Sequence, residues 1–403
     1  MSHFIVIGAG QAGSSLVAKL RKDGFDGEIT LIGAEDSLPY QRPPLSKAYL
    51  LGEMEKERLF LRPESFYHEN NISLRLGQPV TAIDSSAKTV TVGREVLSYD
   101  QLALTTGSAP HRLPAEIGGD LAGVHVVRTL QDIDALAPAV NEGARALIVG
   151  GGYIGLEAAA VCAKRGVSVT LVEMASRILQ RVACAETSGY FRTLHQEHGV
   201  EICEGIGLKQ LCGDAGHVST AELSDGRCLN VDFVVVGVGV APTTDLAQLA
   251  GVDLDNGIKV DAQGRTSDAY IWAAGDCASF PYLGQRIRLE SVPNAIDQAE
   301  VVAANLLGAQ QDYVAQPWFW SDQYDVKLQI AGLNTGFDTV VTRAGQARSM
   351  SFWYYKGDDL LAVDAMNEPR AYMVAKRLID QKKTADKSVV ADPDADLKPL
   401  LKA

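Results

Sequence analysis

Short apolar runs alternate with amphipathic stretches along most of the chain. Residues 3–7 (HFIVI) are an apolar run that ends in a glycine turn, a helical stretch follows, and residues 28–32 form a second apolar run. Residues 144–173 repeat the same order. Apolar strands that alternate with helices are typical of parallel sheets covered on both faces. The repeat therefore predicts an α/β chain with two Rossmann-like dinucleotide-binding domains.

Other segments alternate apolar and polar residues with the period of antiparallel strands. Residues 80–93 predict a hairpin. Beyond about residue 315, several stretches of this kind precede an amphipathic helix over residues 368–383, which predicts a C-terminal α+β domain. Residues 389–403 are polar and broken by prolines, so we expect a loose tail there.

These patterns predict three domains. The first dinucleotide-binding domain comprises residues 1–109 and, after an insertion, residues 237–314, whereas residues 110–236 form the second. Residues 315–403 form the C-terminal domain with its tail. A length of 403 residues agrees with this division, since single cores stop growing at about 250–300 residues.

Composition narrows the class of protein. The chain carries 37 Lys and Arg against 50 Asp and Glu, a formal net charge of −13, which argues against a general affinity for nucleic acid. The longest apolar run, residues 233–241, is too short to cross a bilayer, and no signal-peptide pattern precedes the first apolar run. We therefore expect a soluble, cytoplasmic enzyme that does not bind membranes.

Cysteine and histidine spacings indicate no metal site. The six cysteines form no CxxC pair and no zinc pattern, so we expect free thiols in a reducing compartment. We interpret Cys277 as a small buried residue with an inert sulfur. His195 and His198 lie three positions apart on a predicted helix without further ligands, and we expect both at the surface.

A GxGxxG turn, formed by Gly8, Gly10 and Gly13, joins the first apolar strand to a helix. In this motif the first glycine allows the tight turn, the second lets the backbone approach a pyrophosphate, and the third lets helix and strand pack closely. The helix N-terminus offers free N–H groups to the phosphates. Glu35, 22 residues after Gly13, is placed to bind an adenosine ribose, and Ala34 beside it leaves open which residue meets the ribose.

A second GxGxxG turn occupies residues 150–155. Glu173 ends the next apolar run, where a carboxylate accepts from both ribose hydroxyls and repels a 2′-phosphate, so NADH is favoured over NADPH. Arg177 and Arg181 follow within reach of a 2′-phosphate. Glu157, on the first turn of the helix, either faces the nicotinamide or is an acid that favours a helix N-terminus. An enzyme with two such sites usually holds one nucleotide permanently as a flavin and exchanges the other.

Five further segments carry a specific resemblance. They are LALTTG, TSDAYIWAAGDCA, RPPLSK (residues 42–47), ESVPNA (290–295) and PWFWSDQY (317–324). Together they resemble the FAD-dependent pyridine nucleotide reductases, whose fold is glutathione reductase-like, and within them the NADH:ferredoxin reductases of the putidaredoxin reductase type. The resemblance extends from residue 3 to about residue 383.

The resemblance implies two sets of binding residues and makes the first and second domains the FAD and NAD domains. The FAD set is Gly8, Gly10, Ala12, Gly13, Ala34, Glu35, Arg42, Lys47, Val80, Thr106, Gly107, Arg128, Asp276 and Val292. The NAD set is Gly150, Gly152, Tyr153, Ile154, Gly155, Glu157, Glu173, Gly239 and Glu290.

The resemblance also implies roles within the turn at residues 42–47. Arg42 lies toward the pyrophosphate or adenosine of FAD, and Asp276 binds near the ribityl chain. Lys47 lies near flavin N5, where its ammonium favours the anionic reduced flavin. The alternative for Lys47 is an ordinary surface lysine. Ser46 stands where related disulfide reductases carry a redox cysteine, so electrons leave the flavin without a thiol relay.

The implied function is electron transfer by an FAD-containing NADH:ferredoxin reductase. Hydride passes from NADH to FAD N5, and two single electrons then reach a [2Fe–2S] ferredoxin that feeds a cytochrome P450 or another oxygenase. Trp320 shields the flavin and shapes the partner surface, unless it belongs to the core of the C-terminal domain. A basic face for an acidic ferredoxin draws on Arg62, Arg286, Arg288 and Arg343. We expect a monomer or weak dimer.

Two other functions remain open. One is an NADH-dependent disulfide, peroxide or small-molecule reductase, against which the cysteine inventory counts. The other is a redox-sensing protein of the apoptosis-inducing-factor type, which would turn over slowly and form a long-lived complex with NAD.

Overall fold

The computed structural model describes residues 2–402, which divide into two compact units. Unit 1 consists of residues 2–41, 55–109 and 240–317; unit 2 consists of residues 42–54, 110–239 and 318–402. Both units are therefore discontinuous in sequence. The segment Arg42–Met54, which carries the RPPLSK turn, belongs to unit 2 although it interrupts unit 1 along the chain.

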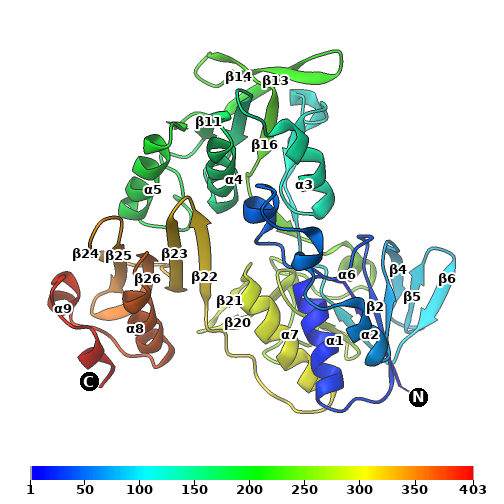
Figure 1. Cartoon of the computed structure of the whole chain (residues 1–403). Coiled ribbons are helices and arrows are strands. Elements are labelled where there is room, and N and C mark those ends of the chain that lie inside the picture. The colour runs from blue at the N-terminus through cyan, green and yellow to red at the C-terminus, as the bar shows by residue number, and fades with distance from the viewer. Residues whose placement is uncertain (1, 403) are drawn as a thin grey trace. The chain divides into compact units, whose positions relative to one another are not determined.

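Unit 1 is built on a five-stranded sheet in which all neighbours run parallel. Its order is β19 (Ile271–Ala273), β7 (Gln101–Leu104), β1 (His3–Ile7), β2 (Glu28–Ile32) and β3 (Ile72–Arg75). Every residue of β1 and β2 after the first is buried, as expected for strands covered on both faces. Helices α1 (Gln11–Lys22) and α7 (Val292–Leu306) lie side by side against this sheet (Figure 1).

Smaller elements complete unit 1. The predicted hairpin is confirmed: β4 and β5 pair antiparallel, and β6 extends them to a three-stranded sheet. The other small sheets are β18–β20–β21 and β8–β17. Their bounds are β4 Val80–Asp84, β5 Thr89–Val92, β6 Glu95–Ser98, β8 Ser108–Pro110, β17 Val240–Pro242, β18 Ile258–Lys259, β20 Ala278–Tyr282 and β21 Gln285–Ile287, beside η2 Lys56–Leu59, α2 Glu64–Glu69 and α6 Asp245–Leu249.

Unit 2 contains a second parallel five-stranded sheet. Its order is β12 (Glu201–Glu204), β11 (Ser168–Glu173), β10 (Arg145–Val149), β16 (Phe233–Val236) and β9 (Val124–Val126). Helix α4 (Tyr153–Lys164) follows β10 as α1 follows β1, so the sequence repeat is a structural repeat. The remaining elements are η1 Leu45–Tyr49, η3 Ala115–Ile117, α3 Leu130–Leu136, η4 Ala137–Ala139, α5 Ala185–Glu197, β13 Leu208–Asp214, β14 His217–Leu223 and β15 Cys228–Asn230.

The C-terminal part of unit 2 is an antiparallel sheet with one long helix against it (Figure 1). The order is β22 (Trp318–Gln323), β23 (Val326–Gly332), β26 (Asp359–Met366), β25 (Met350–Lys356) and β24 (Thr339–Ala344), with α8 at Pro369–Asp380. The predicted fold class is confirmed: two Rossmann-like domains and a C-terminal α+β domain. Within residues 2–402 no helix is both long and apolar enough to cross a membrane.

From its polar residues and prolines we expected residues 389–403 to form a loose tail. The structure differs from that expectation over its described residues, 389–402. The end of the chain forms α9 (Lys387–Ala391) and η5 (Lys398–Leu401), and Val390 and Leu397 are buried in the core of the C-terminal domain. Arg343 on β24 donates hydrogen bonds to five main-chain carbonyls between residues 389 and 395. Pro393 follows the end of α9 and Pro399 lies in the first turn of η5, where proline is tolerated, while the apolar residues and this guanidinium anchor the segment.

A buried polar cluster joins α5 to the C-terminal sheet. Asp364 on β26 accepts a hydrogen bond from Thr187 Oγ1 at 2.7 Å and another from the hydroxyl of Tyr354. Tyr354 in turn accepts from the amide of Cys184 at 3.0 Å. Burial raises the pKa of the Asp364 carboxyl to about 6, although both hydroxyl donors oppose that shift.

The raised pKa of Asp364 predicts a specific pH dependence of stability. A carboxyl whose folded pKa exceeds its unfolded value of about 3.9 binds more protons in the folded state, so its contribution to stability falls as the pH rises from about 4 to 7. Asp364→Asn should remove this component. The difference in unfolding free energy between wild type and Asp364→Asn should therefore decrease by about 1–3 kcal/mol over that range, measured by urea denaturation.

The control is Asp322→Asn, because Asp322 is exposed on β22. Its difference from wild type should not vary with pH beyond a few tenths of a kcal/mol. A wild-type minus Asp364→Asn difference that stays constant between pH 4 and 7 would contradict the assignment.

Candidate functional site

Of the three glycines in the first turn, Gly10 at the N-terminus of α1 has free space beside its Cα atom. Gly8 has φ +114°, and a Cβ there would lie 2.1 Å from the carbonyl oxygen of Thr105. A Cβ at Gly13 would lie 2.0 Å from the carbonyl oxygen of Gly8. These two glycines are required by the protein's own packing, whereas a Cβ at Gly10 would meet nothing within 4 Å. The room at Gly10 fits a phosphate group approaching the free N–H groups of the helix.

The residues expected to surround FAD in unit 1 gather around this turn. The Cβ of Ala12 would be 3.0 Å from a Cβ at Gly275, next to Asp276. Asp276 Oδ2 accepts from Ser108 Oγ at 3.0 Å. Loop residues 106–107 are held by residue 243, since Thr106 Oγ1 donates to its carbonyl at 2.6 Å and its amide donates to the Gly107 carbonyl at 2.9 Å.

The carboxylate expected to bind the ribose lies after β2. Glu35 is half-buried and accepts from the hydroxyl of Tyr40 at 2.5 Å, whereas Ala34 is exposed. A surface hollow next to it is lined by Asp36, Ser37, Leu38, Lys56, Phe60, Glu64 and Leu76. The geometry favours Glu35 over Ala34 as the polar contact, because only Glu35 carries an oriented acceptor.

The second glycine turn repeats the arrangement of the first. Gly150 has φ +106°, and a Cβ at Gly155 would lie 2.0 Å from the Gly150 carbonyl oxygen. A Cβ at Gly152 would meet only the carbonyl oxygen of Gly237, at 4.0 Å. The central glycine is again free of contacts within its unit, as a pyrophosphate site requires.

Glu173, at the end of β11, is oriented by main-chain amides. Its Oε2 accepts from the amide of Gly151 at 2.7 Å, and its Oε1 accepts from the amide of Ala175 at 2.8 Å. The carboxylate is therefore fixed beside the glycine turn, where it retains free lone pairs for ribose hydroxyls. Tyr153 and Ile154 begin α4 immediately after the turn.

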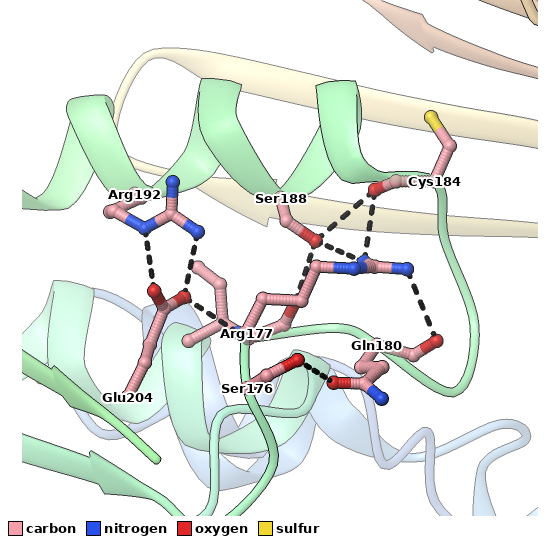
Figure 2. A network of polar contacts seen from close by, with 8 residues as sticks. Ser176, Arg177, Gln180, Cys184, Ser188, Arg192 and Glu204 are labelled. Carbon is pink, nitrogen blue, oxygen red and sulfur yellow. Dashed lines mark hydrogen bonds and ion pairs between the residues drawn. The ribbon is translucent and has the colours of Figure 1, made fainter.

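The guanidinium of Arg177 is bonded to residues 183–188 of its own loop and of α5 (Figure 2). Its guanidinium donates to the carbonyls of Cys184 at 3.0 Å and Ala183 at 2.8 Å and to Ser188 Oγ at 2.5 Å. The side chain thus secures the loop between β11 and α5. Arg181 is exposed, with Nη2 3.4 Å from the position of a Cβ on Gly239.

Figure 2 shows a second contact that secures the same loop. Glu204 on β12 accepts from Arg192 of α5 through both oxygens, each at 2.9 Å, and also from the amide of Ile178 at 2.8 Å. A bidentate Arg–carboxylate pair fixes geometry better than a single contact does. The loop after Glu173 is therefore held between α5 and β12.

Lys47 and Glu157 form a largely buried ion pair in unit 2. Lys47 Nζ donates to Glu157 Oε2 at 2.6 Å and to the Pro43 carbonyl at 3.2 Å, and Ser46 Oγ donates to the same Oε2 at 2.6 Å. Ser321 Oγ, on β22, donates to Glu157 Oε1 at 2.7 Å. Glu157 is 2% exposed, so neither residue is a solvated surface charge.

The backbone of the RPPLSK turn is distorted at Lys47. Residues 45–49 are helical on either side of a kink at Lys47, which has the non-helical angles φ −136° and ψ −114°. Arg42, at the start of the turn, donates to the carbonyl of Arg128 at 2.6 Å, so these two residues, expected near FAD, contact each other within unit 2.

Trp320 is half-buried on β22. Its ring stacks on that of Trp318 with 5.5 Å between centroids, and Trp318 packs against the core of the C-terminal domain. Phe319 points to the other face of the strand, where its ring lies 5.0 Å from that of Tyr153. Trp320 is therefore only partly a core residue.

The remaining candidates are dispersed. Val80 lies on β4 and Val292 begins α7, both in unit 1, and Gly239 ends a segment of unit 2. Glu290 belongs to unit 1, unlike the rest of the expected NAD residues, and it is paired with Arg288.

Several further expectations can be compared with the structure. Cys277 is buried, as expected, and burial raises the pKa of its thiol. All six cysteines are free. The expectation for His195 was wrong: it is fully buried and bonded to Gln323. Among the described residues, no group of three or more His, Cys, Asp or Glu is arranged to hold a metal.

The arginines expected to form a basic face have internal partners. Arg62 donates to Ser14, Arg286 to the carbonyls of residues 260 and 279, Arg288 to Glu290, and Arg343 to the C-terminal segment. Each therefore contributes to the structure of its own unit. We selected these four arginines for their charge, and the charge of a residue does not show which internal groups it contacts.

Comparison with protein families and known proteins adds the following. Residues 2–299 match the family model described as pyridine nucleotide-disulphide oxidoreductase, and residues 318–401 match the model described as reductase C-terminal. The chain is 42% identical over 398 residues to rhodocoxin reductase of Rhodococcus erythropolis, covering 98% of this chain and 93% of that protein. It is 38% identical to putidaredoxin reductase of Pseudomonas putida, covering 100% and 97%.

Solved structures agree with these relatives. The covalent putidaredoxin reductase–putidaredoxin complex superposes with a TM-score of 0.96 at 36% identity, covering 100% of this chain and 98% of the matched chain. The ferredoxin reductase of the CYP199A2 system from Rhodopseudomonas palustris gives 0.94 at 37% identity, with 99% of each chain covered.

The two open glycine positions predict a separation of folding from ligand binding. Gly10→Ala should leave the thermal midpoint within about 2 °C of wild type, because the added methyl group meets no protein atom, yet the flavin content of the purified protein should fall several-fold. Gly152→Ala should leave flavin content unchanged and raise the KM for the nicotinamide nucleotide at least tenfold.

Gly189→Ala in α5 is the matched control, since a Cβ there also meets nothing within 4 Å. It should stabilise the helix slightly and change neither the flavin content nor the KM for the nicotinamide nucleotide. Full flavin content in Gly10→Ala would show that no phosphate approaches that glycine.

Proposed function

Because this chain belongs to the pyridine nucleotide-disulphide oxidoreductase family and carries that family's reductase C-terminal domain, we propose that it is an FAD-containing NADH:[2Fe–2S] ferredoxin reductase. It is an oxidoreductase, and relatives that match its full length are named as ferredoxin, rhodocoxin and putidaredoxin reductases. The electrons would serve a cytochrome P450 or another oxygenase.

The two glycine turns carry this proposal. Each is closed by glycines that the protein itself requires, and at the central glycine of each turn an added Cβ would meet no atom beyond the adjacent residues closer than 4.0 Å. An enzyme that moves electrons from NADH through a flavin needs two dinucleotide sites, one for a resident flavin and one for an exchangeable nucleotide. A dehydrogenase for a small alcohol would need one.

FAD would be held in unit 1. Gly8, Gly10 and Gly13 would place its pyrophosphate at the N-terminus of α1, Glu35 would accept from the adenosine ribose, and Asp276 would bind near the ribityl chain. Bound there, FAD would accept two electrons from NADH and release them one at a time to the iron–sulfur partner.

NADH would bind in unit 2 at the second glycine turn. Glu173, held by two main-chain amides, would accept from the ribose hydroxyls and would repel a 2′-phosphate. The internal bonds of Arg177 support the same preference, because the arginine that follows Glu173 most closely is committed to its own loop.

Lys47 and Glu157 would act on charge at the reaction centre. Glu157, with three donors on its two oxygens, holds the Lys47 ammonium in one place. A fixed ammonium favours the gain of negative charge nearby, which is the change that accompanies reduction of a flavin.

The cysteine inventory argues against the disulfide-reductase alternative. Ser46 occupies the position at which a related disulfide reductase would carry its redox thiol, and its hydroxyl is bonded to Glu157. No two cysteines of the chain form a CxxC pair. Electrons therefore leave without a protein thiol, and the half-buried Trp320 beside Trp318 is our candidate for the partner-facing ring.

The proposed function predicts two consecutive spectral changes. Anaerobic addition of NADH to the purified protein should bleach a yellow flavin absorbance. Stopped-flow mixing with an oxidised [2Fe–2S] ferredoxin should then restore the flavin absorbance while the iron–sulfur absorbance falls. Bleaching without transfer to any of several ferredoxins would move the function to a small-molecule acceptor, and a thiol-dependent reduction of disulfides or peroxide would revive the alternative.

The geometry of Glu173 and Arg177 predicts how coenzyme choice responds to mutation. Glu173→Gln should raise the KM for NADH about tenfold and reduce the discrimination against NADPH, because one charged acceptor is lost. Arg177→Gln should lower the thermal midpoint, since its loop loses several hydrogen bonds, without changing the ratio of kcat/KM for NADH and NADPH. A changed ratio in Arg177→Gln would show that this arginine contacts the nucleotide.

A further inference from the structure

His195 is a buried titratable residue for which the proposed electron path has no use. It lies on α5 with 0% exposure, and burial lowers the pKa of its imidazole to about 4. The ring is therefore neutral at physiological pH. A neutral imidazole has one N–H donor and one acceptor nitrogen, and both are bonded here.

A continuous chain of side-chain hydrogen bonds connects His195 to Glu157. Tyr324 OH lies 3.2 Å from His195 Nδ1, and His195 Nε2 lies 2.8 Å from Gln323 Oε1. Gln323 Nε2 lies 3.1 Å from Ser321 Oγ, and Ser321 Oγ lies 2.7 Å from Glu157 Oε1. The chain runs from α5 through β22 to α4 within unit 2.

The donors and acceptors available on these side chains permit only one direction for the series of hydrogen bonds. An ionised carboxylate only accepts, so Ser321 donates to Glu157 and accepts from Gln323 Nε2. Gln323 then presents Oε1 to His195, which must donate from Nε2. Its Nδ1 is left as the acceptor for the Tyr324 hydroxyl. Every donor along the chain points toward Glu157.

Burying this series of hydrogen-bonded polar side chains costs desolvation free energy that an apolar core would not require. Ser321 and His195 are 0% exposed, Gln323 is 1% exposed, and Glu157 is 2% exposed. Apolar residues of similar volume usually stabilise such a position as well or better, since buried polar groups must first be desolvated. What a fully bonded polar chain provides is a single orientation of its members.

Two consequences follow from the position of the chain on β22. Ser321 and Gln323 lie on one face of the strand and Trp320 lies on the other, because side chains alternate along a strand. The hydrogen-bonded side chains therefore hold the strand that carries Trp320. Through Ser321 they also hold one oxygen of the Glu157 carboxylate, which binds Lys47.

We propose that His195 and Gln323 are positioning residues, which act through Ser321 to orient the Glu157 carboxylate toward Lys47. This inference rests on the proposed function for its kinetic consequence, but the bonding direction it states is a property of the protein alone. The donor of His195 holds the amide of Gln323 with its oxygen toward α5. Without that donor the amide is free to turn over, and Ser321 then donates to Gln323 in place of Glu157.

The direction of the chain is tested without NADH or ferredoxin. ¹⁵N NMR of histidine-labelled protein, with the His195 signal assigned by its loss in His195→Gln, reports the tautomer. We expect a neutral ring protonated on Nε2 throughout pH 5–8. A ring protonated on Nδ1, or one that titrates within that range, would overturn the proposal.

The positioning effect is tested by a double-mutant cycle on flavin bleaching at saturating NADH. His195→Phe and Ser321→Ala should each slow bleaching about tenfold, the effect of one lost hydrogen bond to a charged group. The double variant should be no slower than Ser321→Ala, because both changes remove the same donor from Glu157. The concentration of NADH at half-saturation should not change.

Two further variants separate positioning from loss of structure. His195→Gln keeps an N–H donor for Gln323 and should restore the wild-type rate. His198→Phe, at the C-terminal cap of α5, keeps a ring to stack on Tyr324, where the wild-type rings are 3.7 Å apart, and should also bleach at the wild-type rate. Equal slowing in both phenylalanine variants, or additive effects in the double variant, would show a general disturbance of α5 and reject the proposal.

The outcomes distinguish this inference from the proposed function. Bleaching by NADH without electron transfer to a ferredoxin would reject the ferredoxin as the electron acceptor, and the double-mutant cycle on His195 and Ser321 would still test the positioning effect. If NADH fails to bleach the flavin, the proposed function falls, and the tautomer of His195 still decides the direction of the chain.

Discussion

The buried carboxylate of Glu157 is the constraint around which the core of unit 2 is arranged. A charge that is 2% exposed is tolerated only when hydrogen-bonded partners compensate for its lost hydration. Those partners come from separate parts of the chain: Ser46 and Lys47 from the RPPLSK turn, and Ser321 from the C-terminal domain. The need to satisfy one anion thus gives three distant segments a shared contact, in agreement with their membership of one compact unit.

Backbone geometry imposes the second constraint, and it acts alike in both units. Gly8 and Gly150 adopt positive φ, and Gly13 and Gly155 admit a carbonyl at a distance that excludes any side chain. The middle glycine of each turn has no such reason within the protein. Packing therefore explains two glycines of each motif, whereas the third leaves room that the proposed pyrophosphate would fill.

Sequence patterns predicted the strands, the glycine turns and the individual importance of Lys47 and Glu157, but not the contact between these two residues. They are 110 positions apart, and periodicity does not tell which side chains of two elements meet. The same limit applies to His195, which we expected at the surface because it and His198 had no further metal ligands. Ser321 and Gln323 are two positions apart in PWFWSDQY and thus share one face of a strand, and that spacing was the available signal for a buried polar face.

By itself the sequence determined the two dinucleotide-binding repeats, the C-terminal α+β domain and the absence of a CxxC thiol pair, because strand periodicity, glycine spacing and cysteine spacing are local properties. Only the tertiary structure decided which polar groups are buried together. It committed Arg177 to its own loop, Arg343 to the C-terminal segment and His195 to Glu157 through Gln323 and Ser321. Desolvation and hydrogen-bond satisfaction govern these pairings, and both depend on neighbours that are remote in sequence.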